Sequence, residues 1–125
     1  MSSNLPPSDL ESEWAVIASV LGQPWDSKID QVIGNIAGND FASEGCRVVY
    51  QAIEALNEQK LSVDQPSVKS WLARNNLSGR VDWDDFREAM SNHSWVGDVA
   101  AHIEQVKRMA KLRRMIETCQ RLAAE

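Results

Sequence analysis

The sequence predicts an all-α protein, a compact bundle of about five short helices followed by one long C-terminal helix. Three observations support this prediction. No stretch alternates apolar and polar residues for long enough to form a strand. Residues that cap helices recur just ahead of short segments whose apolar positions have helical spacing. Residues 98–125 contain neither proline nor glycine, and their apolar positions repeat every three or four residues.

The composition predicts one soluble, cytoplasmic domain. A chain of 125 residues suits a single domain, and 43% hydrophobic with 25% charged residues is ordinary for a globular protein. No secretion signal and no run of eighteen apolar residues is present, so we expect no membrane contact. The two cysteines, Cys46 and Cys119, are far apart and fall on apolar helical positions. We therefore expect both to be small buried side chains, and neither a disulfide nor a metal pair.

The first helix should span about Ser8 to Leu21, after a flexible lead of residues 1–7. Ser8 and Glu11 match the S-x-x-E capping box, which opens a helix. Gly22 stands where a C-terminal cap glycine would end it. The residues expected to face the core are Leu10, Trp14, Ile17, Ala18 and Leu21.

The second helix should be capped by Asp26 or Ser27, and the third by Ser43. Residues 57–60 form the turn that closes the third helix. The inward positions of the second helix are Ile29, Val32, Ile33 and Ile36. Those of the third are Cys46, Val49, Ile53 and Leu56. Tyr50 is expected at the flank of the third helix rather than in the core.

The fourth and fifth helices also begin at aspartates that can act as caps. Asp64, two residues before a proline, should start a helix that runs through Arg74. Its buried side should hold Val68, Trp71 and Leu72. Asp82 should start the fifth helix, with a hydrophobic staple between Val81 and Phe86 packing across the cap.

The long helix carries two apolar stripes that point in different directions. Asp98 is its expected cap, so that residues 8–97 form a helical head and residues 98–125 a helix of roughly 42 Å, longer than the head requires. The first stripe, expected to pack on the head, is Val99, Ile103, Val106 and Ala110. The second, offset stripe is Leu112, Ile116, Cys119 and Ala123. It should face another helix that lies outside this chain.

Charge divides the chain into an acidic head and a basic tail. Residues 1–98 hold 7 Lys or Arg against 15 Asp or Glu, a net charge of −8, and residues 99–125 hold 6 against 3, a net charge of +3. The basic residues of the tail are Lys107, Arg108, Lys111, Arg113, Arg114 and Arg121. They could contact nucleic acid or an acidic partner, but a solvated helix face is the favoured interpretation. The whole chain, at net −5, is not a general DNA-binding module.

No catalytic, metal or cofactor site is predicted. The sequence lacks G-x-x-x-x-G-K-[ST], G-x-G-x-x-G and G-x-S-x-G motifs. Three carboxylates, at positions 82, 84 and 85, could hold a cation, but acidic residues in a first helical turn are expected from the helix dipole alone. His93 and His102 have no partner at metal-ligand spacing. The chain is therefore expected to be no enzyme.

Five tryptophans are many for a chain of this length. We expect Trp14 and Trp71 to share a core with Phe86, because all three occupy inward positions of separate helices. The other three lie in turns or at helix starts, where an exposed indole would anchor a partner. These are Trp25, Trp83 and Trp95, and burial against the head is the favoured interpretation for each.

Several segments, in order, resemble the N-terminal region of DnaB-type replicative helicases. Residues 7–21 resemble the opening P-x-S-[IL]-E-A-E-x-x-V-L. Asp40 and Phe41 resemble the D-F pair of the family, and the closing residues 103–116 resemble Y-A-x-x-V-x-x-x-A-x-L-R-x-[LM]-I. Residues 49–56 are similar to I-F-x-A-I-x-x-L and residues 63–72 to P-[IV]-D-x-x-[TS]-[LV]. Departures such as His102 in place of tyrosine are typical of a divergent member.

This resemblance implies a collar domain. In that family a helical head is followed by the first helix of a hairpin that pairs in dimers around a hexameric ring. The collar receives the helicase-binding domain of primase, loaders act on the ring, and ATP hydrolysis and DNA translocation belong to a motor domain that these 125 residues do not contain. The implied partners are therefore a second copy and a primase or loader, with DNA met only indirectly. The residues expected to self-associate or bind a partner are Met109, Leu112, Arg113, Ile116, Cys119, Leu122 and Ala123.

Three other functions are compatible with the sequence. The chain could be the helicase-binding C-terminal domain of a primase, although the helicase-like opening favours the helicase side. It could be a free-standing regulator that mimics the collar. A helix-turn-helix DNA-binding protein is disfavoured, because the head is net −8 and no short helix clusters Arg and Lys.

Overall fold

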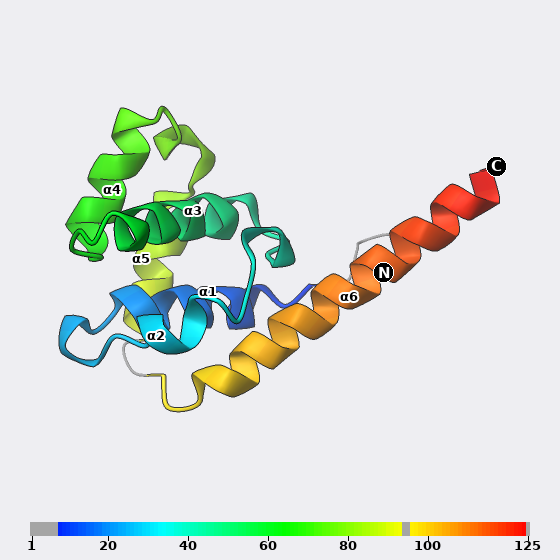
Figure 1. Cartoon of the computed structure of the whole chain (residues 1–125), viewed down its shortest axis with the longest axis horizontal. Helices are drawn as coiled ribbons and strands as arrows, with labels where there is room; N and C mark the ends of the chain where they lie inside the picture. The colour runs from blue at the N-terminus through cyan, green and yellow to red at the C-terminus, as the bar shows by residue number, and fades with distance from the viewer. Residues whose placement is uncertain (1–7, 94–95, 125) are drawn as a thin grey trace.

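A computed structural model describes residues 8–93 and 96–124 as a helical head from which one long helix projects (Figure 1). The α-helices are α1 (Leu10–Leu21), α2 (Ile29–Val32), α3 (Glu44–Glu58), α4 (Gln65–Arg74), α5 (Trp83–Asn92) and α6 (Val99–Ala124). Single-turn 3-10 helices lie at η1 (Pro24–Asp26), η2 (Gly38–Asp40) and η3 (Ser78–Arg80). No strand occurs among the described residues, so the predicted all-α fold of five short helices and one long one is confirmed. The predictions for residues 1–7, Trp95 and residue 125 lie outside the described part.

Helix α1 lies at the centre of the head. It contacts α2, α3, α5 and α6, and every residue from Ala15 to Leu21 is buried. Two predictions for it are wrong. The cap is Asp9, whose side chain accepts the Ser12 N–H at 3.0 Å, and not the preceding serine. Leu10, expected in the core, is 51% exposed, because it is the first residue of α1 and lies at an open groove beside α5.

A buried carboxylate joins α1 to the start of α3. Glu13 is only 1% exposed, and its two oxygens accept the backbone N–H groups of Ala42 and Ser43, each at 2.9 Å. Buried charges are tolerated where hydrogen bonds satisfy them, as they do here. Ser43 in turn caps α3 by accepting the N–H of Cys46. The Glu13 carboxylate thus fixes the segment that leads into α3.

The predicted caps of α3, α4 and α5 are confirmed. The side chains of Ser43, Asp64 and Asp82 each accept backbone N–H groups from the first turn of their helices. Helix α2 differs from its prediction. Lys28 occupies its N-cap position, and the helix ends after four residues, just before Gly34 takes a φ of +88° that favours glycine.

Aromatic rings fill two parts of the core. Tyr50, predicted at a flank, is fully buried, with its hydroxyl donating to the Ile36 carbonyl at 2.8 Å. Between α1 and α5, the rings of Trp14 and Phe86 meet edge to face, with centroids 6.2 Å apart. Trp71 is half-buried against the same core. Trp14 and Phe86 thus meet as predicted, whereas Trp71 packs only in part against the common hydrophobic core.

The tryptophans expected in turns do not all pack inward. Trp83 is half-buried, stacks edge to face on Phe86 and donates its indole N–H to the Ser78 carbonyl. Trp25, for which burial was favoured, is 83% exposed on η1. That prediction was wrong because a turn residue has no helical periodicity from which its direction can be read.

Candidate functional site

The first half of α6 is attached to the head. Asp98 accepts the Ala101 N–H at 3.2 Å, the hydrogen bond that a cap makes. The first apolar stripe is buried as predicted, at Val99, Ile103, Val106 and Ala110. Burying these side chains on the head holds the helix along α1, with which it makes its most extensive contact.

A polar cluster reinforces the packing of α6 on α1. Ser12 Oγ lies 3.1 Å from His102 Nδ1 and donates to Asp9 Oδ2, also at 3.1 Å. The hydrogen bond from the Ser12 backbone N–H lowers the pKa of the Asp9 carboxyl, because it stabilises the charged form. His102 thus links two helices, as expected for a half-buried histidine without metal-ligand partners.

The head and tail are also fastened at Asp40. Its backbone carbonyl accepts from Arg113 at 2.7 Å, and its carboxylate accepts from Arg114 at 2.6 Å and from the Ala37 N–H at 2.9 Å. The Asp40 side chain is only 10% exposed, so this ion pair is well shielded on the carboxylate side. From the sequence, Arg113 was expected to bind a partner, and Asp40 was not expected to take part in this site. The only sequence feature that pointed to Asp40 was the Asp-Phe pair shared with the family.

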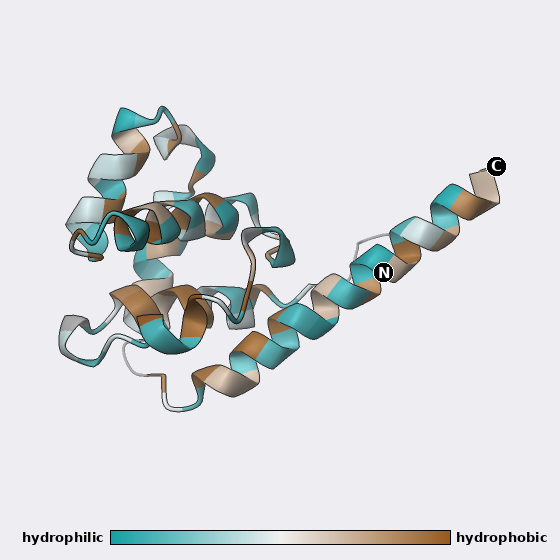
Figure 2. Ribbon diagram, viewed as in Figure 1, coloured by the Kyte–Doolittle hydropathy of each residue, from teal (hydrophilic) through white to brown (hydrophobic). Residues whose placement is uncertain are grey.

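From about Leu112 onward, α6 carries apolar residues into solvent, and beyond Arg114 it has left the head (Figure 2). Leu112 is 39% exposed and Ile116 is 42% exposed, and Cys119 and Ala123 on the same stripe are also exposed. Leu122 is the most exposed of the apolar residues here, whereas Met109 is half-buried beside the head. Cys46 is buried as predicted, but the predicted burial of Cys119 is wrong in the single chain, because no part of the head reaches that turn of the helix.

The exposed stripe is suited to pairing with another helix. Its members recur at steps of four, three and four residues, which places them on one side of the helix. In the described part of the chain all four are exposed, Leu112 and Ile116 in part. We call Leu112, Ile116, Cys119 and Ala123 the seam. An apolar row at this spacing has the geometry of a helix–helix contact.

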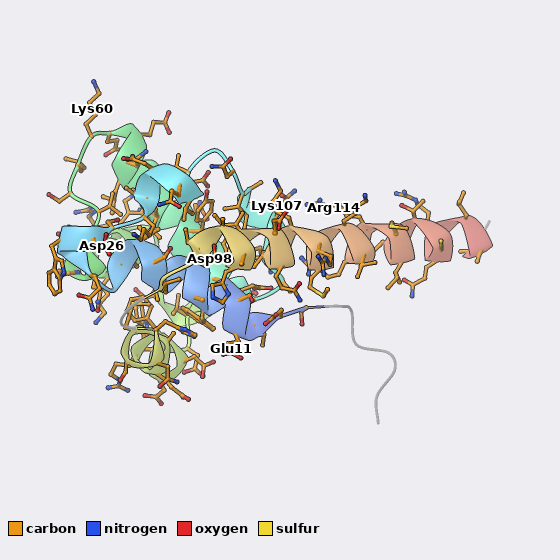
Figure 3. The ribbon with its side chains drawn as sticks, turned by 90° about the horizontal axis from the view of Figure 1, so that it is seen from below. Glu11, Asp26, Lys60, Asp98, Lys107 and Arg114 are labelled. Carbon is orange, nitrogen blue, oxygen red and sulfur yellow. The ribbon has the colours of Figure 1, made fainter. Side chains whose placement is uncertain are left out.

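Another side of α6 is basic. Lys107, Lys111 and Arg114 recur at steps of four and three, on a side of the helix different from the seam. Together with Arg108, Glu104 and Asp40 they line a cavity of about 450 Å³ where the helix leaves the head. Figure 3 shows Lys107 and Arg114 on the same side of α6. Most of the positive charge of the tail is therefore gathered on one surface.

The described residues offer no metal centre and no membrane-spanning helix. No group of three His, Cys, Asp or Glu side chains within them is arranged to hold an ion. The acidic run at the start of α5 acts as a cap, because Asp82 accepts the N–H groups of Asp84 and Asp85. None of the helices in the two described ranges combines the length and the apolar character needed to cross a bilayer.

Comparison with known proteins identifies the fold and the family. Residues 5–108 match the family described as the DnaB-like helicase N terminal domain. A crystal structure of the N-terminal domain of DnaB helicase from Mycobacterium tuberculosis superposes with a TM-score of 0.83 at 24% identity, covering 96% of this chain and 83% of that one. The likeness extends to α6, since almost the whole chain is covered.

Two curated relatives are replicative DNA helicases of the DnaB type. The one from Pasteurella multocida is 30% identical over 115 residues, covering 90% of this chain. The one from a Nostoc species is 34% identical over 80 residues, covering 64% of this chain. The chain spans 24% and 9% of the lengths of these relatives. The chain therefore belongs to the family of DnaB-like helicase N-terminal domains.

Proposed function

We propose that this chain is the protein-interaction and oligomerisation domain of a hexameric replicative DNA helicase, and that it helps to form the collar of the ring. In this proposal the head docks a primase or a helicase loader, the seam of α6 pairs with another helix, and DNA is met only indirectly. The observation that supports it most is the seam, an apolar row that continues on α6 after the helix has left its own head. The family match supports the helicase side over the primase alternative.

The energetics favour a weak contact for this chain alone. Burying two or three apolar side chains on each copy offers about 1.5 to 3 kcal/mol per side chain. Association costs an estimated 4 to 15 kcal/mol before any gain is visible. The two sums are similar, so we expect a dimer that forms only at high protein concentration. A second hairpin helix, as the resemblance implies, would add the apolar area that a stable collar needs.

Sedimentation equilibrium across a concentration series tests the proposal. Ile116→Asp places an unpaired charge in the seam, so it should weaken association while the head stays folded. Thr118→Asp is the matched control, because it adds the same charge to an exposed position off the seam. Wild type and Thr118→Asp should associate alike and more strongly than Ile116→Asp. Equal association of all three, or a wild type that stays monomeric at about 1 mM, would contradict the proposed seam.

A further inference from the structure

The head carries an acidic groove that the proposed function does not use. It lies between α1 and α5, has a cavity volume of about 290 Å³, and is floored by the apolar side chains of Leu10, Trp14 and Ala89. Three carboxylates line it, from Glu11, Asp85 and Glu88. Leu10 is half exposed within this groove although it stands at an apolar position of α1. An apolar floor with an acidic rim is complementary to a segment that is both apolar and cationic.

The same chain exposes such a segment on α6. We define the basic flank as Lys107, Arg108, Lys111 and Met115. Lys107, Lys111 and Met115 recur every four residues and Arg108 lies three residues before Lys111, so the four share one side of the helix. The three cations are exposed, and Met115 is 55% exposed. Methionine is flexible and polarisable, and so adapts well to a shallow apolar floor. The flank therefore offers the positive charges and the apolar side chain that are complementary to the groove.

One copy cannot bring the two surfaces together. Figure 3 shows Glu11 on the opposite side of α6 from Lys107 and Arg114. The helix is held in that orientation by its buried stripe and by the Asp40 junction. The contact between groove and flank must therefore join two chains if it forms.

We propose that the groove between α1 and α5 binds the basic flank of α6 from a second copy of this chain. Such a contact is head-to-tail, with different surfaces on the two copies, and it leaves one groove and one flank free on every pair. Contacts of this kind propagate into a closed ring or an open chain, whereas a seam between like helices closes as a dimer. The contact is centred on Lys107 and Lys111, on the side of α6 next to the seam, while Arg108 and Met115 lie at the border, three or four residues from Leu112 and Cys119. It goes beyond the proposed function and does not depend on it, because it requires no contact between two seams.

A charge exchange in variants of the 125-residue chain tests this contact. All proteins carry Ile116→Asn, which removes the apolar seam without adding charge, so that a negative result has no bearing on the seam. The groove variant adds Glu11→Lys and Glu88→Lys, and the flank variant adds Lys107→Glu and Lys111→Glu. The control adds Asp30→Lys and Glu58→Lys, two exposed carboxylates outside the groove. Far-UV circular dichroism and a thermal melt establish that each is folded.

Sedimentation velocity is measured at an ionic strength of about 0.01 M, where the Debye length is about 30 Å, and at about 0.15 M, where it is about 8 Å. The Ile116→Asn parent and the control should associate at low salt and dissociate at high salt. The groove variant and the flank variant should each be monomeric alone, and an equimolar mixture of the two should associate, because every groove then meets a flank of opposite charge. A monomeric parent at low salt, unaltered association of either variant alone, or a mixture that stays monomeric would overturn the proposal.

Discussion

Removing the Glu13 carboxylate should destabilise the head strongly, because this carboxylate is buried and holds the segment that leads into α3. The side chain is 1% exposed, and both of its oxygens accept backbone N–H groups at 2.9 Å. Hydrogen bonds to a charged group contribute about 1.5 to 3 kcal/mol each. Glu13→Ala loses two of them and leaves the N–H groups of Ala42 and Ser43 without these acceptors, while it also removes the cost of burying a charge. We therefore expect a loss of about 3 to 5 kcal/mol in the free energy of unfolding.

Urea denaturation followed by circular dichroism measures this loss. Glu13→Gln keeps one acceptor oxygen but turns an NH₂ group toward the second N–H, so its loss should lie between wild type and Glu13→Ala. Glu11→Ala is the matched control, because Glu11 is an exposed carboxylate on the same helix and should change stability by less than about 0.5 kcal/mol. A Glu13→Ala variant within about 1 kcal/mol of wild type would refute the reasoning.

Three further perturbations test other contacts. Phe86→Ala should cost about 3 to 5 kcal/mol in a urea melt, and Trp71→Ala clearly less because it is only half-buried; the reverse order would misplace the core. Because the cap bond lowers the pKa of Asp9 in the folded state, its stabilisation is complete above the unfolded-state pKa and is lost as pH falls through the folded-state pKa. The stability advantage of wild type over Asp9→Asn should therefore shrink below about pH 4, and a constant difference would contradict this. Arg114→Ala removes the ion pair with Asp40. Amide hydrogen exchange should become faster in the middle of α6, while the free energy of unfolding falls by less than about 1 kcal/mol. Unchanged exchange would show that this ion pair does not hold the helix on the head.

The elements that sequence could predict are those set by neighbouring residues. Asp64 and Asp82 were correctly placed as caps because a cap bonds N–H groups two or three residues ahead, within reach of local inspection. The same logic failed by one residue at α1, where serine and aspartate are adjacent and both suit a cap. Asp9 accepts the capping hydrogen bond from the Ser12 N–H, and the Ser12 hydroxyl contacts His102.

The features that sequence could not predict depend on contacts between distant segments. Glu13 is bonded to groups 29 and 30 residues away, and Asp40 is paired with a residue 74 positions later. Periodicity placed Tyr50 at a flank, yet its ring is buried near Phe41, with centroids 5.2 Å apart. The exposure of Cys119 has the same origin, since apolar spacing marks a face of a helix but does not say whether the partner lies in the same chain.

The reactivity of the Cys119 thiol tests the seam most directly. Cys119 is exposed in the single chain and Cys46 is buried, so a thiol reagent such as 5,5′-dithiobis(2-nitrobenzoate) reports on the seam. The rate constant per thiol should fall as protein concentration rises through the range in which wild type associates, because pairing covers the stripe. In Ile116→Asp, and in a Thr118→Cys, Cys119→Ser variant whose thiol lies off the stripe, the rate constant should not change with concentration. If wild-type Cys119 reacts equally fast at every concentration while sedimentation shows dimers, the chains pair through another surface and the seam is not the self-association site.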